Sequence, residues 1–380
     1  MAEAQANPWI YSVFWLLAAG VLAACTPEAG LDAARAYVAD PAVGRAALEA
    51  ALVDPTNGYS ARRLERYRPE VWGALPEQRP RVALVIPGQP PGDWLELPTE
   101  LPADLDTWRA LGQQAFERWP VQVDLALRAA WEDPETALNA GLYVDATGAL
   151  PLVWVDLPGG PQLAYTCATC HQGGQARFDE RALRTGRPSR GAGRLDVTAD
   201  DQDNPTTITD LRPIRWQTHL HRAATLRNGL LSLAVRIETL LITSADEQHR
   251  PPRVIAFALA WYLWGLADTL PPLPAPPAVF ERACSGCHSG EALAGPPVPL
   301  AALGPLSTQA ALIGGSRERG TGAWRVTSLR GVGTRHPLLA SGEVSDLKAL
   351  FDPERTGEHA FGRDLDPTDR AALLAWLARL

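Results

Sequence analysis

The stretches Cys167-Ala-Thr-Cys170-His171 and Cys284-Ser-Gly-Cys287-His288 repeat one pattern, in which two cysteines stand three positions apart and a histidine follows at once. Together they use four of the five cysteines of this 380-residue chain. Because cysteine and histidine are so scarce here, one match by chance has odds on the order of a thousandth, and two are implausible. The pattern indicates chemistry that needs two thiols and one imidazole in a short turn.

A c-type haem has this requirement, since two thiols form thioether bonds to the porphyrin and the adjacent imidazole ligates the iron. Both motifs supply all three groups without substitution. We therefore predict two covalently bound haem c groups. The predicted residues are Cys167, Cys170 and His171 for the first haem and Cys284, Cys287 and His288 for the second.

Zinc is the alternative, because Cys-x-x-Cys pairs also bind this metal. Zinc ribbons separate their two pairs by about 15–20 residues, whereas 113 residues lie between Cys170 and Cys284. Zinc also does not require a histidine directly after each pair. The spacing favours haem over zinc and over a structural role for the cysteines.

The surroundings of the two motifs also repeat. The motifs begin 117 residues apart, a Thr-x-Leu-Arg pattern recurs at 209–212 and 327–330, and an Ala-Trp pair recurs at 260–261 and 375–376. Residues 270–277, Leu-Pro-Pro-Leu-Pro-Ala-Pro-Pro, form a stiff linker between the two halves. The repeat predicts two tandem cytochrome c-like domains.

Apolar residues recur at helical spacing in four segments, 31–52, 105–131, 253–266 and 369–380. The last two close the two haem units. We therefore expect a mainly α fold with two tandem cytochrome c-like haem domains and an N-terminal helical extension. The expected divisions are a signal peptide at 1–25, the extension at 26–150, the first haem domain at 151–270 and the second at 271–380.

The first residues predict export from the cytoplasm. Residues 9–24 are apolar and lead into Leu22-Ala23-Ala24-Cys25, which resembles the bacterial lipobox. The run is shorter than the ~20 residues of a membrane span and suits a signal sequence. We expect Cys25 to be lipidated, although the segment before the run lacks Lys and Arg; an uncleaved anchor helix is the alternative. Either arrangement tethers the body to a membrane on the periplasmic side, and Thr26 is compatible with the outer membrane.

The net charge of −8 argues against nucleic acid as a partner, because nucleic acids select basic surfaces. An acidic surface suits a basic protein partner instead. Residues 26–150 contain neither cysteine nor histidine, and their sequence indicates no chemistry.

From residue 167 to its end, the chain resembles the bacterial di-haem cytochrome c peroxidase family. The resemblance is carried by Val-Thr-Ser-Leu-Arg-Gly-Val at 326–332 and Pro-Leu-Leu-Ala-Ser-Gly at 337–342, where the family reads roughly TLRNV and PYFHDGS. It implies a second haem that passes electrons from a redox protein to a peroxidatic first haem, which reduces a small oxidant such as peroxide. Ala340 stands where the family usually has histidine. The family's distal methionine has no counterpart, because Met1 is the only methionine.

The sixth ligand of each iron decides between electron transfer and catalysis. For the first haem we expect His219 or His221, which could divide the roles of ligand and general acid-base; a bond to a propionate or to the backbone is the alternative. For the second haem we rank His359 above His336, because by the resemblance His359 falls near the position of the family's distal methionine. His219 and His336 each follow the motif histidine by 48 residues, whereas His249 reads as a solvated loop residue.

The sequence suggests two further candidate sites, each with an alternative reading. Arg212 and Arg330, similarly placed in the two halves, are candidate partners of the anionic haem propionates, with an ordinary surface position as the alternative. The acidic stretch 196–210, with Asp200, Asp201 and Asp203, has oxygen ligands that calcium prefers, but its spacing does not match an EF-hand and a solvated loop is the alternative.

Two classes of function follow. The first is a peroxidase-like oxidoreductase with an open first iron. The second is a membrane-tethered electron carrier in which both irons have six ligands.

Overall fold

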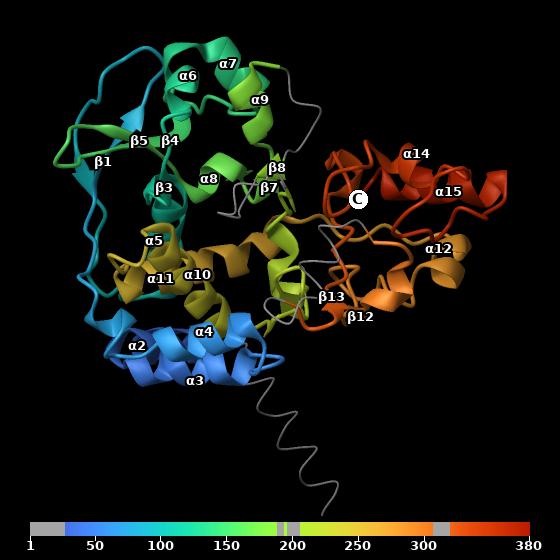
Figure 1. Ribbon diagram of the computed structural model, residues 1–380, viewed down its shortest axis with the longest axis horizontal. Coiled ribbons are helices and arrows are strands. Elements are labelled where there is room, and N and C mark those ends of the chain that lie inside the picture. Colours follow the sequence, from blue (N-terminus) through green and yellow to red (C-terminus); the bar gives the residue numbers. More distant parts are fainter. Residues whose placement is uncertain (1–26, 188–193, 196–205, 307–319) are drawn as a thin grey trace, which may run out of the picture.

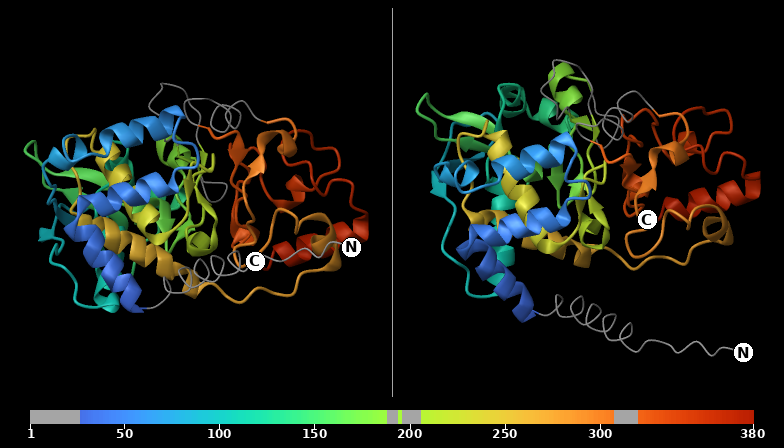
Figure 2. Two further views of the ribbon diagram at one scale, coloured as in Figure 1. Left: turned by 90° about the horizontal axis from the view of Figure 1, so that it is seen from below. Right: turned by 60° about the horizontal axis from the view of Figure 1, so that its bottom comes forward.

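The computed structural model describes residues 27–187, 194–195, 206–306 and 320–380. The chain is mainly helical, as predicted. Two bodies lie side by side: a larger one built from described residues between 27 and 269, and a smaller one built from described residues between 278 and 380 (Figure 1). Both views in Figure 2 keep this arrangement.

Three helices open the larger body: α2 (Pro27–Ala39), α3 (Pro41–Ala51) and α4 (Gly58–Arg66). The sequence predicted one helical segment over 31–52. The chain breaks it because the carboxylate of Asp40 caps α3 by accepting from the amide of Ala42, 2.8 Å away, and Pro41 occupies the first turn. A cap and a proline at this position start a new helix.

The core of this body forms where these helices meet α5 (Leu105–Arg118), α10 (Leu230–Ser244) and α11 (Arg253–Gly265). Helices α5 and α11 cross closely at Gly112. A methyl group at this position would lie 2.0 Å from the carbonyl oxygen of Ala258. The small residue therefore sets the distance between the two helices.

A five-stranded antiparallel sheet stands beside the helices, in the order β2-β1-β4-β5-β3. The strands are β1 (Arg81–Val85), β2 (Leu95–Glu96), β3 (Gln122–Val123), β4 (Leu150–Val155) and β5 (Gln162–Tyr165). The extension expected over 26–150, with helical segments in it, thus also contains the strands β1, β2 and β3. The strands are short, and the central pairing joins Ala83 to Trp154, which lie more than sixty residues apart in the chain. No local sequence pattern therefore predicts the sheet.

The predicted boundary at residue 150 coincides with the first residue of β4, which pairs with β1 on one side and β5 on the other. One face of the sheet packs on α6 (Leu127–Glu132), α7 (Pro134–Asn139) and α9 (Glu180–Thr185). Residues 26–150 and the segment of the first motif thus share cores.

Shorter elements fill the rest of this body. They are η1 (Trp72–Ala74), α8 (Cys167–Cys170), β6 (His171–Gln172), β7 (Gln175–Ala176), β8 (Arg194–Leu195), β9 (Thr206–Thr207), η2 (Arg212–Trp216), β10 (His219–Leu220), β11 (Leu226–Arg227) and η3 (Leu266–Thr269).

The smaller body has a core of its own, in which Phe280 and Trp376 pack with ring centres 4.4 Å apart. Its elements are α12 (Ala278–Ala283), β12 (Val298–Pro299), η4 (Leu300–Leu303), β13 (Ala323–Trp324), η5 (Val332–Thr334), α14 (Leu347–Leu350) and α15 (Pro367–Leu377). The two closing helices predicted from periodicity are confirmed as α11 and α15.

Within the described parts of the chain, no helix has both the length and the apolar composition needed to cross a bilayer. Cys25 and the acidic residues Asp200, Asp201 and Asp203 lie outside the described residues, so the lipid anchor and the calcium site stay predictions.

Candidate haem sites

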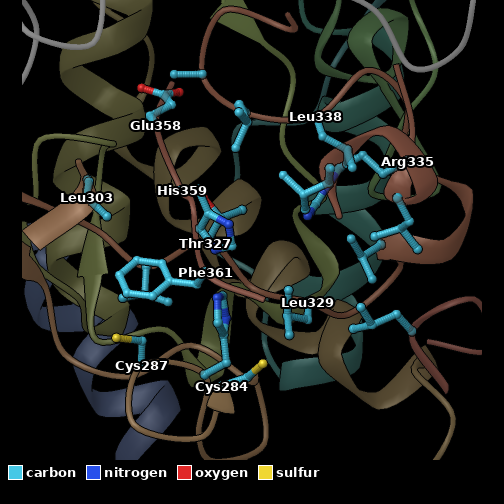
Figure 3. A pocket seen from close by; sticks show the side chains of 18 of the residues that line it. Cys284, Cys287, Leu303, Thr327, Leu329, Arg335, Leu338, Glu358, His359 and Phe361 are labelled. Carbon is cyan, nitrogen blue, oxygen red and sulfur yellow. The ribbon is translucent and has the colours of Figure 1, made fainter. Parts of the chain in front are cut away.

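The second motif begins where α12 ends. The amide of Cys284 donates to the carbonyl of Phe280 at 2.8 Å, and the amide of His288 donates to the carbonyl of Cys284 at 2.9 Å. These bonds wind the five residues into one compact turn. Cys284, Cys287 and His288 line the same cavity. Figure 3 shows the two cysteines at its edge.

The orientation of His288 is fixed by a backbone oxygen. Its Nδ1 lies 2.9 Å from the carbonyl oxygen of Leu293. Because a carbonyl only accepts, Nδ1 carries the proton and the lone pair belongs to Nε2. A metal-binding histidine is usually oriented in this way, by a hydrogen bond from its other nitrogen.

His359 lines the same cavity and lies above Cys284 and Cys287 in the view of Figure 3. Its ring centre is 6.2 Å from that of His288, and the two ring planes meet at 62°. Removal from water lowers the pKa of His359 to about 4, and the neighbouring His288 adds to this shift. Removal from water also lowers the pKa of His288. Both imidazoles are therefore neutral near pH 7.

The backbone at His359 is held in an unusual conformation. Its φ of 58° lies in the left-handed region, which costs free energy for a residue other than glycine. Its amide donates to the carbonyl of Leu303 at 2.9 Å, and the guanidinium of Arg355 donates to its carbonyl at 2.6 Å. These contacts hold the ring over the cavity.

The pair fits the ligand set of a bis-histidine haem. Two imidazoles on opposite sides of one metal ion, each with a metal–nitrogen bond of about 2.0 Å, hold their ring centres roughly 6 Å apart. The observed 6.2 Å matches this separation. The cavity walls are largely apolar, as a porphyrin requires, and include Phe280, Val326, Leu329, Leu338, Leu350, Phe351 and Leu373.

The first motif follows strand β5. Thr166 caps α8. The amide of Thr166 donates a hydrogen bond to the hydroxyl of Thr169 at 2.8 Å, and this hydroxyl donates to the carbonyl of Pro151. Cys167 packs against the helical core and Cys170 against the core beneath the sheet. The motif is thus anchored at the junction of the two cores.

His171 starts the small β6–β7 hairpin, whose turn is closed by a 3.0 Å bond from the amide of Gly174 to the carbonyl of His171. Among the residues that the structure describes, its buried Nδ1 has no hydrogen-bond partner. Removal from water lowers the pKa of His171 to about 4, opposed by the negative charge of Asp210. The ring is therefore neutral, as a metal ligand must be.

His221, a candidate ligand and catalytic residue, has both nitrogens engaged within the protein. Nε2 accepts from the guanidinium of Arg236, so Nδ1 carries the proton and donates to the hydroxyl of Thr225. The edge of Tyr59 packs on the ring with centres 5.2 Å apart. Burial and the charge of Arg236 hold the pKa of His221 well below its usual value.

The other candidate histidines have different surroundings. His219 is half-buried, with Nδ1 3.0 Å from the hydroxyl of Thr218. His336 does not line the cavity, whereas Arg335 and Pro337 on either side of it do. His249 is exposed, as expected for a loop residue. Of the candidate sixth ligands, His359 is brought opposite a motif histidine.

Arg212 and Arg330 are both committed to neighbours. Arg212 forms a two-pronged ion pair with Asp210, with the closest atoms 2.6 Å apart. Arg330 donates to the backbone carbonyls of Glu291 and Pro271 and to the Glu291 carboxylate. Their proposed contact with propionates stays a prediction.

Sequence reasoning missed Trp216. This side chain from the larger body packs against the buried cluster of Ala292, Ala294 and Val326, against which Cys287 of the smaller body also packs. The Arg330 guanidinium lies over the Trp216 ring at 5.1 Å. At the other end of the same segment, the amide of Leu211 donates to the carbonyl of Gly174, in the turn after His171. Residues 211–216 thus connect the surroundings of the two motifs.

Sequence reasoning also missed three arginines of the second cavity, Arg222, Arg325 and Arg335. A signal for two of them was present. Arg-Ala-Ala-Thr-Leu-Arg at 222–227 and Arg-Val-Thr-Ser-Leu-Arg at 325–330 share the pattern Arg-x-x-(Ser/Thr)-Leu-Arg.

Comparison with known proteins gives little information about this site. No family model and no curated protein matches the chain. Among solved structures, one similar chain is described as a MauG-like protein associated with microbial copper homeostasis. The similarity covers 69% of this chain and 92% of that one, with 15% identity and a TM-score of 0.38.

Proposed function

We propose that this chain is a di-haem c-type cytochrome, related in architecture to the bacterial di-haem cytochrome c peroxidases, that transfers electrons outside the cytoplasm. The observation that carries the proposal is the facing pair His288 and His359 over an apolar cavity edged by Cys284 and Cys287. Two thiols, a histidine in the same turn and a second histidine at ligand separation form the complete donor set of a six-coordinate haem c.

The second haem would then be an electron-transfer centre. When bound, the haem supplies one-electron redox chemistry, and the protein supplies two neutral imidazoles and a largely apolar wall. Because methionine ligation raises the potential, two histidines imply a lower potential than a methionine–histidine pair.

A second candidate function, reduction of a small oxidant such as peroxide at the first haem, is supported by the surroundings of His221. Its Nε2 accepts a hydrogen bond from Arg236 and its Nδ1 donates one to Thr225. These two bonds occupy both of the nitrogens with which His221 could ligate iron. An iron held by His171, with neither His221 nor His219 as its second histidine ligand, would keep one coordination position for a small molecule. Electrons for this reaction would come from a redox protein through the second haem, and residues 211–216 contact the surroundings of both motifs.

The anchor completes the proposal. Lipidation at Cys25 would tether the protein to a membrane with its haems on the periplasmic side, where c-type haem is attached. The donor or acceptor protein would meet the haems there.

Mass spectrometry and spectroscopy of protein matured in an exporting host test the proposal. The polypeptide should be heavier by two haem groups, and the oxidised protein should show at least one low-spin haem. Carbon monoxide added to the reduced protein separates the two candidates: one equivalent bound indicates an open first iron, and none indicates an electron carrier. Free thiols at both motifs would refute the di-haem assignment.

A further inference from the structure

Three arginines converge on the second cavity from separate segments. Arg222 belongs to the β10–β11 hairpin of the larger body, whereas Arg325 follows β13 and Arg335 follows η5 in the smaller body. Arg325 is only 8% exposed. The cavity is therefore lined by cationic groups from both bodies.

Among the described residues that line the cavity, acidic side chains do not balance these charges. Glu358 is the one acidic residue among the lining residues, all of which the structure describes, so three positive charges face one negative charge. Asp210 lowers the cost of charging Arg335, but it is already paired with Arg212. The wall carries an excess of about two positive charges, and buried charges are costly without counter-ions.

The electrostatics of the arginines agree with this count. Removal from water, together with the charges of Arg325 and Arg335, lowers the pKa of Arg222 to about 9. Removal from water and the charge of Arg335 lower the pKa of Arg325 to about 10. A buried group that is destabilised by its cationic neighbours is stabilised by an anion.

The guanidinium groups also have donors to offer. Nη2 of Arg222 is bonded to the carbonyl and hydroxyl of Thr207, and Nη1 of Arg325 to the side chain of Gln217. Within the described part of the chain, the Nε of Arg325 is buried and has no hydrogen-bond partner. Since each guanidinium has five N–H donors in a planar fork, carboxylates are the ligands that match them.

The cluster sits on the contact between the two bodies. The amide of Arg325 donates to the carbonyl of Arg222 at 2.7 Å, and the amide of Thr207 donates to the carbonyl of Ala340 at 3.0 Å. The hydroxyl of Thr321 donates to the carbonyl of Ala223 at 2.7 Å. The first arginines of the two Arg-x-x-(Ser/Thr)-Leu-Arg segments therefore meet across this contact.

We propose that Arg222, Arg325 and Arg335 form a shared dicarboxylate site that binds the two propionates of the second haem and joins both bodies through the cofactor. The excess of two positive charges equals the charge of two ionised carboxylates. The inference rests on the proposed function and assigns to these arginines the role first expected of Arg212 and Arg330.

Redox titration of the holoprotein tests the site. Removing one cation leaves a propionate uncompensated, which disfavours the additional electron of the ferrous state. Arg222→Gln, Arg325→Gln and Arg335→Gln should each shift the equilibrium of the second haem toward the ferric state at least tenfold, about 59 mV for one electron. The charge-conserving Arg325→Lys should stay within threefold of the wild type.

The matched control is Arg282→Gln, which removes an arginine of the smaller body whose side chain is 60% exposed and paired with Asp369. It should leave the equilibrium unchanged. Equal behaviour of Arg282→Gln and Arg325→Gln would overturn the proposal, and so would a shift confined to Arg330→Gln. An effect of Arg325 and Arg335 without one of Arg222 would refute the shared site.

A second measurement, on Arg325→Lys, tests the site even if the glutamine variants fail to fold. With ¹³C-labelled haem carboxyl groups, the infrared difference between oxidised and reduced protein should show a carboxylate band that moves in Arg325→Lys, because lysine lacks the planar fork. An unmoved band would overturn the contact. In both measurements, two bound haems and a low-spin spectrum show that the proposed function stands whichever way the arginines behave; loss of haem from the second motif in the wild type would overturn both.

Discussion

The imidazole rings of His288 and His359 face each other across one cavity, 6.2 Å apart between centres, although 71 positions separate them in the chain. The first ring is positioned by the turn of the Cys-x-x-Cys-His motif and its bond to Leu293. The second is positioned by a left-handed backbone held by Leu303 and Arg355. Two independent local devices thus produce one ligand pair.

Replacing His359 should open the second iron. His359→Ala removes one imidazole, so the low-spin signal of the second haem should convert to high-spin, and the reduced variant should bind one more equivalent of carbon monoxide than the wild type. His336→Ala is the matched control, because His336 does not line the cavity. A low-spin signal that persists in His359→Ala and is lost in His336→Ala would reverse the assignment.

The crossing of α5 and α11 should not tolerate a methyl group at Gly112. Alanine gains about 1 kcal/mol of helix propensity over glycine, but its Cβ would lie 2.0 Å from the carbonyl oxygen of Ala258. Overpacking of this kind costs about 1–3 kcal/mol, and a clash with backbone belongs at the upper end. Gly112→Ala should therefore lower the free energy of unfolding by about 2 kcal/mol.

The midpoint of urea unfolding at constant slope measures this change. Gly92→Ala is the control, because a Cβ at Gly92 would meet no atom within 4 Å. Its midpoint should stay within about 0.5 kcal/mol of the wild type. Equal midpoints for the two variants would show that α5 and α11 can move apart without lowering the free energy of unfolding.

A buried carboxylate ties the N-terminal helices to α10. The hydroxyls of Tyr37 and Tyr67 both donate to Glu238, the latter at 2.6 Å, and Arg253 lies 3.8 Å from the same carboxylate. Burial and the charge of Glu238 raise the pKa of both tyrosines, so the phenols remain protonated donors. Tyr67→Phe should cost about 1.5–3 kcal/mol, the usual range for a hydrogen bond to a charged group.

Chemical unfolding compares this variant with Tyr143→Phe, in which the tyrosine replaced is 46% exposed. The control should unfold like the wild type. If Tyr67→Phe also matched the wild type, the carboxylate would have another donor in solution.

Sequence patterns were informative where the determinant is local. The two Cys-x-x-Cys-His turns and the closing helices around Trp261 and Trp376 are each specified by neighbouring residues, and the helices α11 and α15 follow the predicted spacing. The sheet was missed because β1 finds its partner in β4 far along the chain. Its side chains carry no helical or strictly alternating pattern that distinguishes a five-residue strand.

The candidate site divides in the same way. His359 was inferred from its position relative to the family's ligand, but the occupation of both nitrogens of His221 depends on Arg236 and Thr225, which only folding brings to it. Arg222 and Arg325 are 103 positions apart and meet through a backbone hydrogen bond. Their common role depends on the contact between the two bodies, which neither segment encodes alone.

The stability of the protein should fall as the pH drops below about 6.5, and His221 is one of the buried histidines responsible. Its folded-state pKa lies well below the ordinary value of 6.5, so the folded protein resists a proton that the unfolded chain accepts. The contribution of His221 to stability is fully present above pH 6.5 and is lost as the pH falls toward the folded pKa, with a slope of at most about 1.4 kcal/mol per pH unit for one histidine.

Asparagine tolerates the φ of 61° at this position, so His221→Asn should retain the fold. It should also make the urea midpoint depend less steeply on pH between pH 6.5 and 5. The exposed His249 provides the control, since His249→Asn should keep the wild-type slope. A wild-type slope in His221→Asn would mean that this histidine is protonated in the folded protein and that the bond from Arg236 does not persist.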